Sequence, residues 1–148
     1  MTTSLQEKGL SLRKLLNATP PYFKNNAQDV VIKKLEKKLT KGGLKAIVST
    51  SYGTESKQTL PHKQTIIGLD RDKVTSKPLN INKCKRVLAQ CSCQSYLFSG
   101  AEYANWHHGA AKIIYGNGDK PVVNNPQLQF FLCKHLVKIA RKVIEKDW

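Results

Sequence analysis

The stretch Cys91-Ser92-Cys93, together with Cys133-Lys134-His135 further along the chain, decides how this sequence folds. Three thiols and one imidazole, grouped as C-x-C and C-x-H, make a complete tetrahedral ligand set for zinc. Two close pairs from separate segments can assemble such a site, because closing a longer loop costs only logarithmically more free energy. The sequence therefore predicts one metal site that closes the base of an inserted unit, residues 94–132.

Two other interpretations of the cysteines stay open. Cys84 could join Cys91, Cys93 and Cys133 around an iron–sulfur cluster, since thiolate sites accept both kinds of metal centre. Buried cysteines can also act as small hydrophobic side chains without any metal. The basic surroundings Lys83-Cys84-Lys85-Arg86 favour Cys84 as a bystander or core residue. We therefore expect zinc at the other three cysteines and His135.

The rest of the chain does not predict an enzyme. Four protein ligands leave no open position on zinc, whereas a zinc hydrolase keeps one. Acidic residues are few and scattered, so no carboxylate pair for acid–base catalysis is evident. His107 and His108, adjacent on a predicted helix, would point about 100° apart and would chelate one metal poorly. We expect a structural metal site in a protein without catalytic activity.

The chain is strongly basic. Its 148 residues include 25 lysines and arginines against 10 acidic residues, a formal net charge of +15. Solubility requires a net charge of only about 2–8, and the basic residues are spread along the whole chain. Such a protein usually lies near a polyanion, which predicts contact with nucleic acid or with an acidic partner surface. Apolar runs fall far short of the ~20 residues of a membrane span, and we expect a protein made in a reducing cytosol.

Hydrophobic periodicity predicts an α+β fold, with a small antiparallel sheet of about three strands and helices on one side. Strands are expected at residues 44–52, 64–69 and 80–90, and helices at residues 5–16, 26–41, 96–115 and from residue 135. We divide the chain into a helical N-terminal arm, residues 1–43, and an α+β metal-binding body, residues 44–148. Zinc would clamp the C-terminal half of that body.

The predicted helix at 26–41 carries an apolar stripe and a lysine face. This face is the expected contact for nucleic acid or an acidic partner, although a solvated amphipathic face has the same pattern. Its members are Lys33, Lys34, Lys37, Lys38 and Lys41.

The layout C-x-C…C-x-H-L, preceded by a strand and followed by a helix, resembles the SWIM-type zinc finger. The four ligands of that family correspond to Cys91, Cys93, Cys133 and His135, and the leucine to Leu136. The gap between the two pairs is much longer here than in that family. This resemblance implies a zinc-binding module that contacts nucleic acid or protein.

A longer string is similar to small virion proteins of tailed bacteriophages. Besides the ligand pairs, it includes Glu102-Tyr103-Ala104, Gly109-Ala110-Ala111, Ile114-Tyr115-Gly116-Asn117-Gly118 and Asn125-Pro126. The resemblance implies a tail, baseplate or neck component with a metal-stapled fold. Its partners would be other virion proteins in a symmetric assembly, built in the host cytoplasm, with non-specific nucleic acid as a further contact. We expect Tyr22, Phe23, Phe130 and Phe131 to be buried against such partners.

Overall fold

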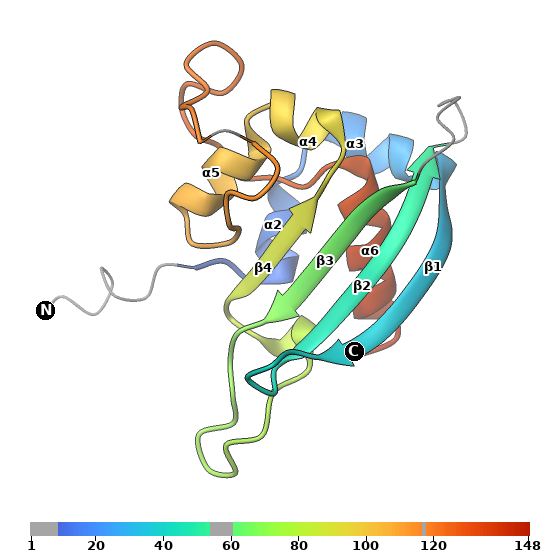
Figure 1. The fold of residues 1–148 in the computed structure, drawn as a ribbon, viewed down its shortest axis with the longest axis vertical. Coiled ribbons are helices and arrows are strands. Elements are labelled where there is room, and N and C mark those ends of the chain that lie inside the picture. The colour runs from blue at the N-terminus through green and yellow to red at the C-terminus, as the bar shows by residue number, and fades with distance from the viewer. Residues whose placement is uncertain (1–8, 54–60, 117) are drawn as a thin grey trace, which may run out of the picture.

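The computed structural model describes residues 9–53, 61–116 and 118–148, and it has the predicted α+β architecture (Figure 1). One antiparallel sheet contains four strands in the order β1-β2-β3-β4. The strands are β1 (Val30–Leu39), β2 (Lys45–Gly53), β3 (His62–Gly68) and β4 (Val87–Cys91). Each strand pairs with its neighbour in sequence, so the sheet is a simple meander with β1 and β4 at its edges.

Helices cover one face of this sheet (Figure 1). They are α2 (Leu12–Ala18), α3 (Pro21–Asn26), α4 (Gln94–Phe98), α5 (Ala101–His107) and α6 (Lys134–Glu145). Two short 3₁₀ turns, η1 (Ala27–Asp29) and η2 (Ile81–Lys83), join the longer elements. Among the helices of the described part of the chain, none has the length and apolar character needed to cross a membrane.

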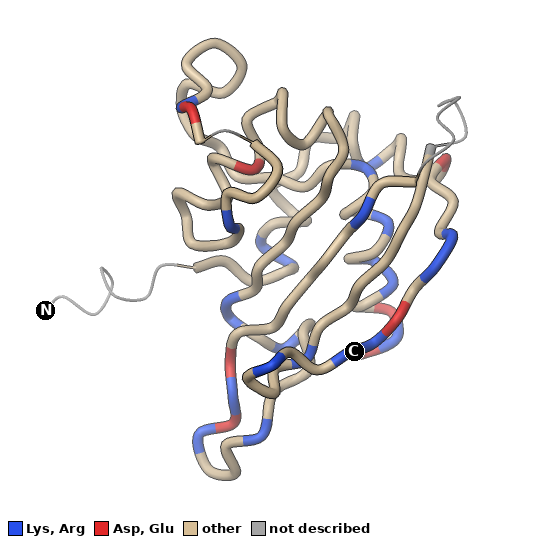
Figure 2. The backbone as a smooth tube through the Cα atoms, viewed as in Figure 1, with Lys and Arg blue, Asp and Glu red and all other residues tan. Residues whose placement is uncertain are grey.

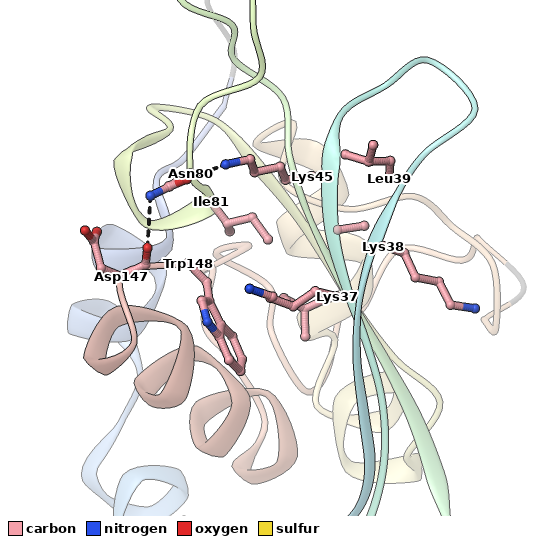
Figure 3. A pocket seen from close by; sticks show the side chains of 10 residues that line it. Lys37, Lys38, Leu39, Lys45, Asn80, Ile81, Asp147 and Trp148 are labelled. Atoms are coloured by element: carbon pink, nitrogen blue, oxygen red, sulfur yellow. Dashed lines mark hydrogen bonds between the residues drawn. The ribbon is translucent and has the colours of Figure 1, made fainter.

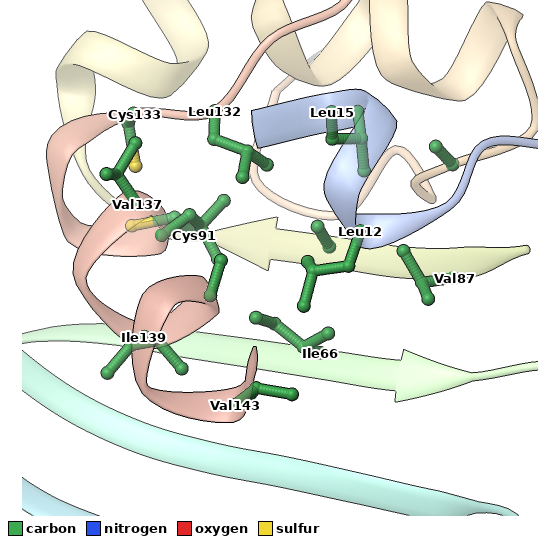
Figure 4. Close-up of a cluster of buried hydrophobic side chains, with 14 of the residues drawn as sticks. Leu12, Leu15, Ile66, Val87, Cys91, Leu132, Cys133, Val137, Ile139 and Val143 are labelled. Carbon is green, nitrogen blue, oxygen red and sulfur yellow. The ribbon is translucent and has the colours of Figure 1, made fainter. Parts of the chain in front are cut away.

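Helix α6 supplies the centre of the core, as the apolar spacing of the last segment predicts. Leu136, Ile139, Ala140 and Val143 recur at helical spacing and are fully buried. They belong to one cluster with inward side chains of the sheet and with Leu12 and Leu15 of α2 (Figure 4). Burying a leucine or isoleucine contributes about 1.5–3 kcal/mol each, so α6 and α2 fix the helix layer on the sheet.

The prediction of a helix at residues 26–41 is wrong, because most of this segment forms strand β1. Its register against β2 shifts between Ile32 and Lys34, at a β-bulge. The bulge puts Ile32 and Leu35, three residues apart, opposite Ser51 and Ser49 and therefore on the same face of the sheet. That spacing imitates a helical stripe, while the β-branched run from Val30 to Ile32 favours a strand.

The five lysines consequently do not share one helix face, and their role as contacts for nucleic acid or an acidic partner stays a prediction. Side chains of a strand alternate between its two faces, so these lysines do not share one surface. Lys34 and Lys38 lie with Glu36, and their Nζ atoms are 2.8 and 3.5 Å from its carboxylate oxygens. Lys37 points to the opposite face, and Lys41 lies beyond β1 in the following turn. Lysines and arginines are instead distributed over the whole backbone (Figure 2).

Residues 1–43 are predicted to form a helical arm. In the described part of this segment, the fold contains a strand of the sheet as well as helices. Helices α2 and α3 and the turn η1 do lie in this segment, but they lead into edge strand β1. The hydroxyl of Thr19, just after α2, accepts a hydrogen bond of 2.9 Å from the backbone N–H of Leu132. This buried contact joins the start of the chain to the residue that precedes Cys133.

The long helix predicted at residues 96–115 is also wrong. The structure has two short helices, α4 and α5, separated by Gly100, whose φ of 77° lies in the left-handed region. A Cβ at Gly100 would come within 2.7 Å of Pro121, so the loop that follows packs directly against this break. The buried Glu102 carboxylate accepts backbone hydrogen bonds from Tyr115 and Gly116, at 3.0 and 2.9 Å, which hold the chain folded back on α5.

Asp70 closes the excursion between β3 and β4. Its carboxylate accepts hydrogen bonds from the backbone N–H groups of Lys85 and Arg86, at 2.6 and 3.0 Å. The Arg86 guanidinium also lies 2.9 Å from Asp70 Oδ1. Burial alone would raise the pKa of Asp70, but the hydrogen bonds from Arg86 and Lys85 outweigh it, and the pKa is lowered.

Asp70→Asn is expected to lower the free energy of unfolding by about 1.5–3 kcal/mol near neutral pH, the usual value for hydrogen bonds to a charged group. Because the folded-state pKa of Asp70 is lowered, its stabilisation is present above the unfolded pKa and is lost as pH falls through the folded pKa. The difference between the variant and the wild type should therefore shrink in acid. Urea unfolding of both proteins, near neutral pH and in acid, measures this difference in the free energy of unfolding. Asp72→Asn is the control, because the Asp72 carboxylate accepts hydrogen bonds from Val74 and Thr75 within its own exposed turn. A constant difference across pH would contradict the argument.

Candidate metal centre

The structure brings the four predicted ligands together. Cys91 is the last residue of β4, Cys93 is the N-cap of α4, Cys133 is the N-cap of α6, and His135 lies in the first turn of α6. One ligand atom from each lies within 4.8 Å of all the others, and all four residues are buried. Figure 4 shows the sulfur atoms of Cys91 and Cys133 at one end of the hydrophobic core. The quartet forms a buried cluster that could hold a metal ion.

Local structure fixes the first ligand pair. Ser92, between the two cysteines, pairs with Lys63 of β3: its hydroxyl accepts the Lys63 N–H at 2.8 Å, and its own N–H donates to the Lys63 carbonyl at 3.0 Å. The Cys93 sulfur then caps α4 by accepting the backbone N–H of Tyr96 at 3.4 Å. The turn after β4 is thereby held at both ends, and the two thiols converge.

The second pair is placed by the start of α6. The Cys133 carbonyl accepts the backbone N–H of Val137 at 2.9 Å, which begins the helix at this cysteine. The N-terminus of a helix carries a partial positive charge that stabilises thiolates. The helix N-terminus therefore offers Cys133 a partial positive charge, which acts against the effect of burial on this thiol.

A buried polar network that the sequence did not predict supports Cys91. The Gln64 side-chain amide donates a hydrogen bond of 3.5 Å to the Cys91 sulfur. Its carbonyl oxygen accepts hydrogen bonds from the hydroxyls of Ser49 and Ser51, at 2.9 and 2.7 Å. All three side chains are buried. Because the serines hold the amide oxygen, the amide N–H is directed at the sulfur, an arrangement that stabilises a thiolate and a metal bound to it.

The pKa values of the three thiols in the cluster are shifted in different directions. Burial raises the pKa of Cys91 and of Cys133. Contact with the Cys133 thiol, and next with the Cys91 thiol, lowers the pKa of Cys93. The buried cluster thus accommodates one thiolate readily and opposes three. A divalent cation at the centre would supply the missing positive charge and allow all three cysteines to bind as thiolates.

His135 gives an independent indication of a metal. Within the described part of the chain, neither of its ring nitrogens has a hydrogen-bond partner, although both are buried. Leaving a buried polar group unpaired costs about 1–3 kcal/mol. Coordination of a metal through one ring nitrogen would remove part of this cost. The His62 ring lies edge-on to His135 at a centroid distance of 5.1 Å, so a second imidazole stands beside the cluster.

Cys84 does not belong to the cluster. Its thiol is buried elsewhere, 3.5 Å from the carbonyl oxygen of Asn80, and it fills the space beside Gly68. The pKa of Cys84 is raised, and burial of the thiol is the main cause. The structure therefore places Cys84 as the core residue expected from its basic sequence context, apart from the other three cysteines.

The remaining residues singled out from sequence lie away from the cluster. His108 is hydrogen-bonded to the Leu128 carbonyl at 3.0 Å and does not share a ligand group with His107. The expectation that four aromatic side chains are free for partners is wrong for Phe131, which is buried and stacked on Phe23 at 5.2 Å. Tyr22, by contrast, is 70% exposed.

Gln64→Leu is expected to weaken metal binding by about 10–100-fold, the usual effect of removing a partner of a metal ligand. It should also lower the free energy of unfolding by about 1–3 kcal/mol, because the Ser49 and Ser51 hydroxyls lose their acceptor. Competition with a chromogenic chelator measures the affinity. Thr65→Val is the matched control, since it changes the next residue of β3 on the other face. Equal metal affinity in Gln64→Leu and wild type would show that the amide does not act on Cys91.

The geometry of this cluster is the main guide to function. No family model, no curated protein and no solved structure matches this chain.

Proposed function

We propose that this protein is a structural component of a tailed-phage virion whose fold is held together by one zinc ion at Cys91, Cys93, Cys133 and His135. The observation that carries the metal part is the buried, complete quartet of three sulfurs and one nitrogen. This donor set suits zinc, which takes four such ligands in structural sites. With four protein ligands, no coordination position remains for a substrate, so the ion stabilises the fold and performs no chemistry.

The place of the site in the fold supports a stapling role. The ligands come from the end of β4 and from the starts of α4 and α6. One ion would therefore tie the sheet to α6, which fills the core, and close the base of the 94–132 insertion. A small protein that must survive in a particle gains stability from such a staple without a larger core.

The virion part rests on the resemblance of residues 91–136 to small virion proteins and on the exposed surface. Side chains with large apolar area remain at the surface of the insertion, where a neighbouring subunit could cover them. Among them, Phe98 is 67% exposed and Val123 is 85% exposed. Together with Tyr22, these residues replace the buried Phe131 as the expected contacts of an assembly.

Elemental analysis and light scattering on the purified protein test this proposal. We expect about one zinc per chain and a defined ring-like oligomer, or incorporation into particles when neighbouring virion proteins are present. Phe98→Ser and Val123→Ser should weaken assembly while zinc content and melting temperature stay unchanged. Iron with sulfide in place of zinc, or a strict monomer that never joins a particle, would contradict the proposal.

A SWIM-like zinc module that binds nucleic acid is the second candidate, favoured by the net charge of +15. Phosphate contacts release counterions, so DNA affinity should fall steeply with added salt. A monomer that binds one DNA sequence tightly at physiological salt would favour this candidate over the virion role. Binding that is weak, salt-sensitive and independent of sequence fits the virion role, in which basic surfaces line a DNA path or meet acidic neighbours.

A further inference from the structure

A cavity of about 300 Å³ opens at the end of β1 (Figure 3). The metal cluster lies at the opposite end of the strands, where Cys91 pairs with Gln64. Its walls are mostly apolar and come from β1, β2, η2 and the residues after α6. Trp148, Ile47, Ile81 and Leu39 supply most of this apolar wall. The volume is at the lower end of the range for ligand sites, about 300–1,000 Å³, and suits one large side chain.

Two ammonium groups stand at this cavity. Lys37 Nζ lies over the Trp148 ring, 5.3 Å from its centroid. Lys45 Nζ is hydrogen-bonded to the Asn80 side-chain oxygen at 2.6 Å. Within the described residues, neither lysine forms an ion pair with a carboxylate, whereas Lys38, pointing away in Figure 3, is paired with Glu36. Asp147 also lines the cavity, and its carboxylate accepts a hydrogen bond from the Asn82 side chain. Lys37 and Lys45 outnumber this one acidic side chain, so the cavity suits an apolar group that lies beside an anion.

The cavity adjoins an open sheet edge. Strand β1 pairs only with β2, and no backbone hydrogen bond from another described segment reaches its outer edge. Val30–Leu39 thus presents unpaired N–H and C=O groups along ten residues. Such an edge can accept a further strand. On one face Lys34 and Lys38 share Glu36 between them, and Lys37 lies on the other face. The strand thus keeps an excess of positive charge, so the incoming strand should be acidic.

We propose that β1 binds an extended, acidic segment of a partner polypeptide, which adds to the sheet as a fifth strand and inserts one large apolar side chain into the cavity beside Trp148. This deepens the proposed function, because it names the class of neighbour that the basic protein meets. Backbone pairing with β1 positions the segment, glutamates or aspartates meet the flanking lysines, and the inserted side chain fixes the register. Lysines on an edge strand can also serve only to prevent self-association of the sheet. That role alone would not need a cavity at the end of the strand.

The test uses the full-length protein as purified and a labelled, capped, glutamate-rich peptide in which one phenylalanine stands two residues from a glutamate, so that both side chains project to the Lys37 face. Fluorescence anisotropy should show saturable binding. In a Trp106→Phe background, the remaining tryptophan, Trp148, should report the peptide through a change in emission. Lys37→Glu should weaken binding by about tenfold or more, equivalent to a loss of about 1.4 kcal/mol. Lys73→Glu, the same charge change in the exposed turn between β3 and β4, should leave binding within about twofold of wild type.

Two altered peptides separate the parts of the proposal. Replacing phenylalanine by alanine should weaken binding and abolish the Trp148 signal, and methylating alternate backbone nitrogens should prevent strand pairing and binding. No binding of the parent peptide, equal binding of the methylated peptide, or equal weakening by Lys37→Glu and Lys73→Glu would overturn the proposal. Binding is measured on the isolated protein and does not depend on metal identity or on particle assembly. Failure of the zinc or virion proposal therefore leaves this result interpretable, and the reverse also holds.

Discussion

Cys93→Ser is expected to abolish stoichiometric metal binding and to destabilise the protein severely. The Cys93 sulfur lies in the ligand cluster and caps α4, and contact with Cys133 and then with Cys91 lowers its pKa. A serine hydroxyl does not replace a thiolate on zinc. Structural zinc contributes about 10–16 kcal/mol of binding free energy in small zinc-finger peptides, comparable to the ~5–15 kcal/mol stability of a whole domain. We expect the variant to lose most of its folded population.

Cys84→Ser is the matched control for this experiment. It makes the same chemical change at another buried thiol, but Cys84 lies outside the cluster. We expect full metal content and a modest loss of stability, since a hydroxyl replaces a buried thiol. Elemental analysis and thermal unfolding of both variants distinguish the outcomes. Equal metal loss from both, accompanied by iron and sulfide, would establish a four-cysteine cluster instead.

Removing the metal with a strong chelator near neutral pH is expected to lower the melting temperature by more than about 10 °C. A change of 1 kcal/mol shifts the melting temperature by about 2–4 °C in proteins of about this size, and the expected loss is several times larger. Burial raises the pKa of Cys91 and Cys133, so protons compete with the metal for these sulfurs. Metal affinity should therefore fall as pH falls, and less chelator should suffice in mild acid.

Differential scanning calorimetry with and without chelator, on samples whose metal content has been verified, checks this prediction. Restoring zinc should restore the original melting temperature, which excludes damage by the chelator. If the melting curve is unchanged after complete metal removal, the cluster is a set of buried thiols that packs without an ion. In that case His135 would have to find a hydrogen-bond partner after rearrangement.

The ligand set and the last helix could be predicted from sequence because both are local patterns. C-x-C and C-x-H bring donors close in pairs, and the apolar spacing of Leu136, Ile139 and Val143 repeats over a whole helix without interruption. The α+β class and the strands near residues 44–52 and 64–69 follow from alternation in the same way. In each case the nearest neighbours in sequence decide the structure.

The prediction errors arise where residues far apart in the sequence decide the local structure. A bulge between Ile32 and Lys34 hides the alternation of β1, and only pairing with β2 reveals it. The break at Gly100 depends on the return of Pro121, and the buried Glu102 depends on the backbone of Tyr115 and Gly116. The support of Cys91 by Gln64 was missed. Ser49 and Ser51 lie on the core-facing side of β2, where polar side chains need partners, but the alternation that predicts this strand runs through Leu44, Ala46, Val48 and Thr50 on the other face.

The position of α6 along the chain has a consequence for how the protein is made. Strands β1 to β4 are synthesised one after another and can pair locally, but α2 covers only part of the apolar face of their sheet before α6 follows. Cys133 and His135 stand at the start of that same helix, so the metal site becomes complete just as the missing cover is synthesised. Binding of an ion by Cys91 and Cys93 and then by Cys133 and His135 would dock α6 on the sheet in a single late folding step. Metal present while the chain folds would therefore be expected to raise the yield of folded protein.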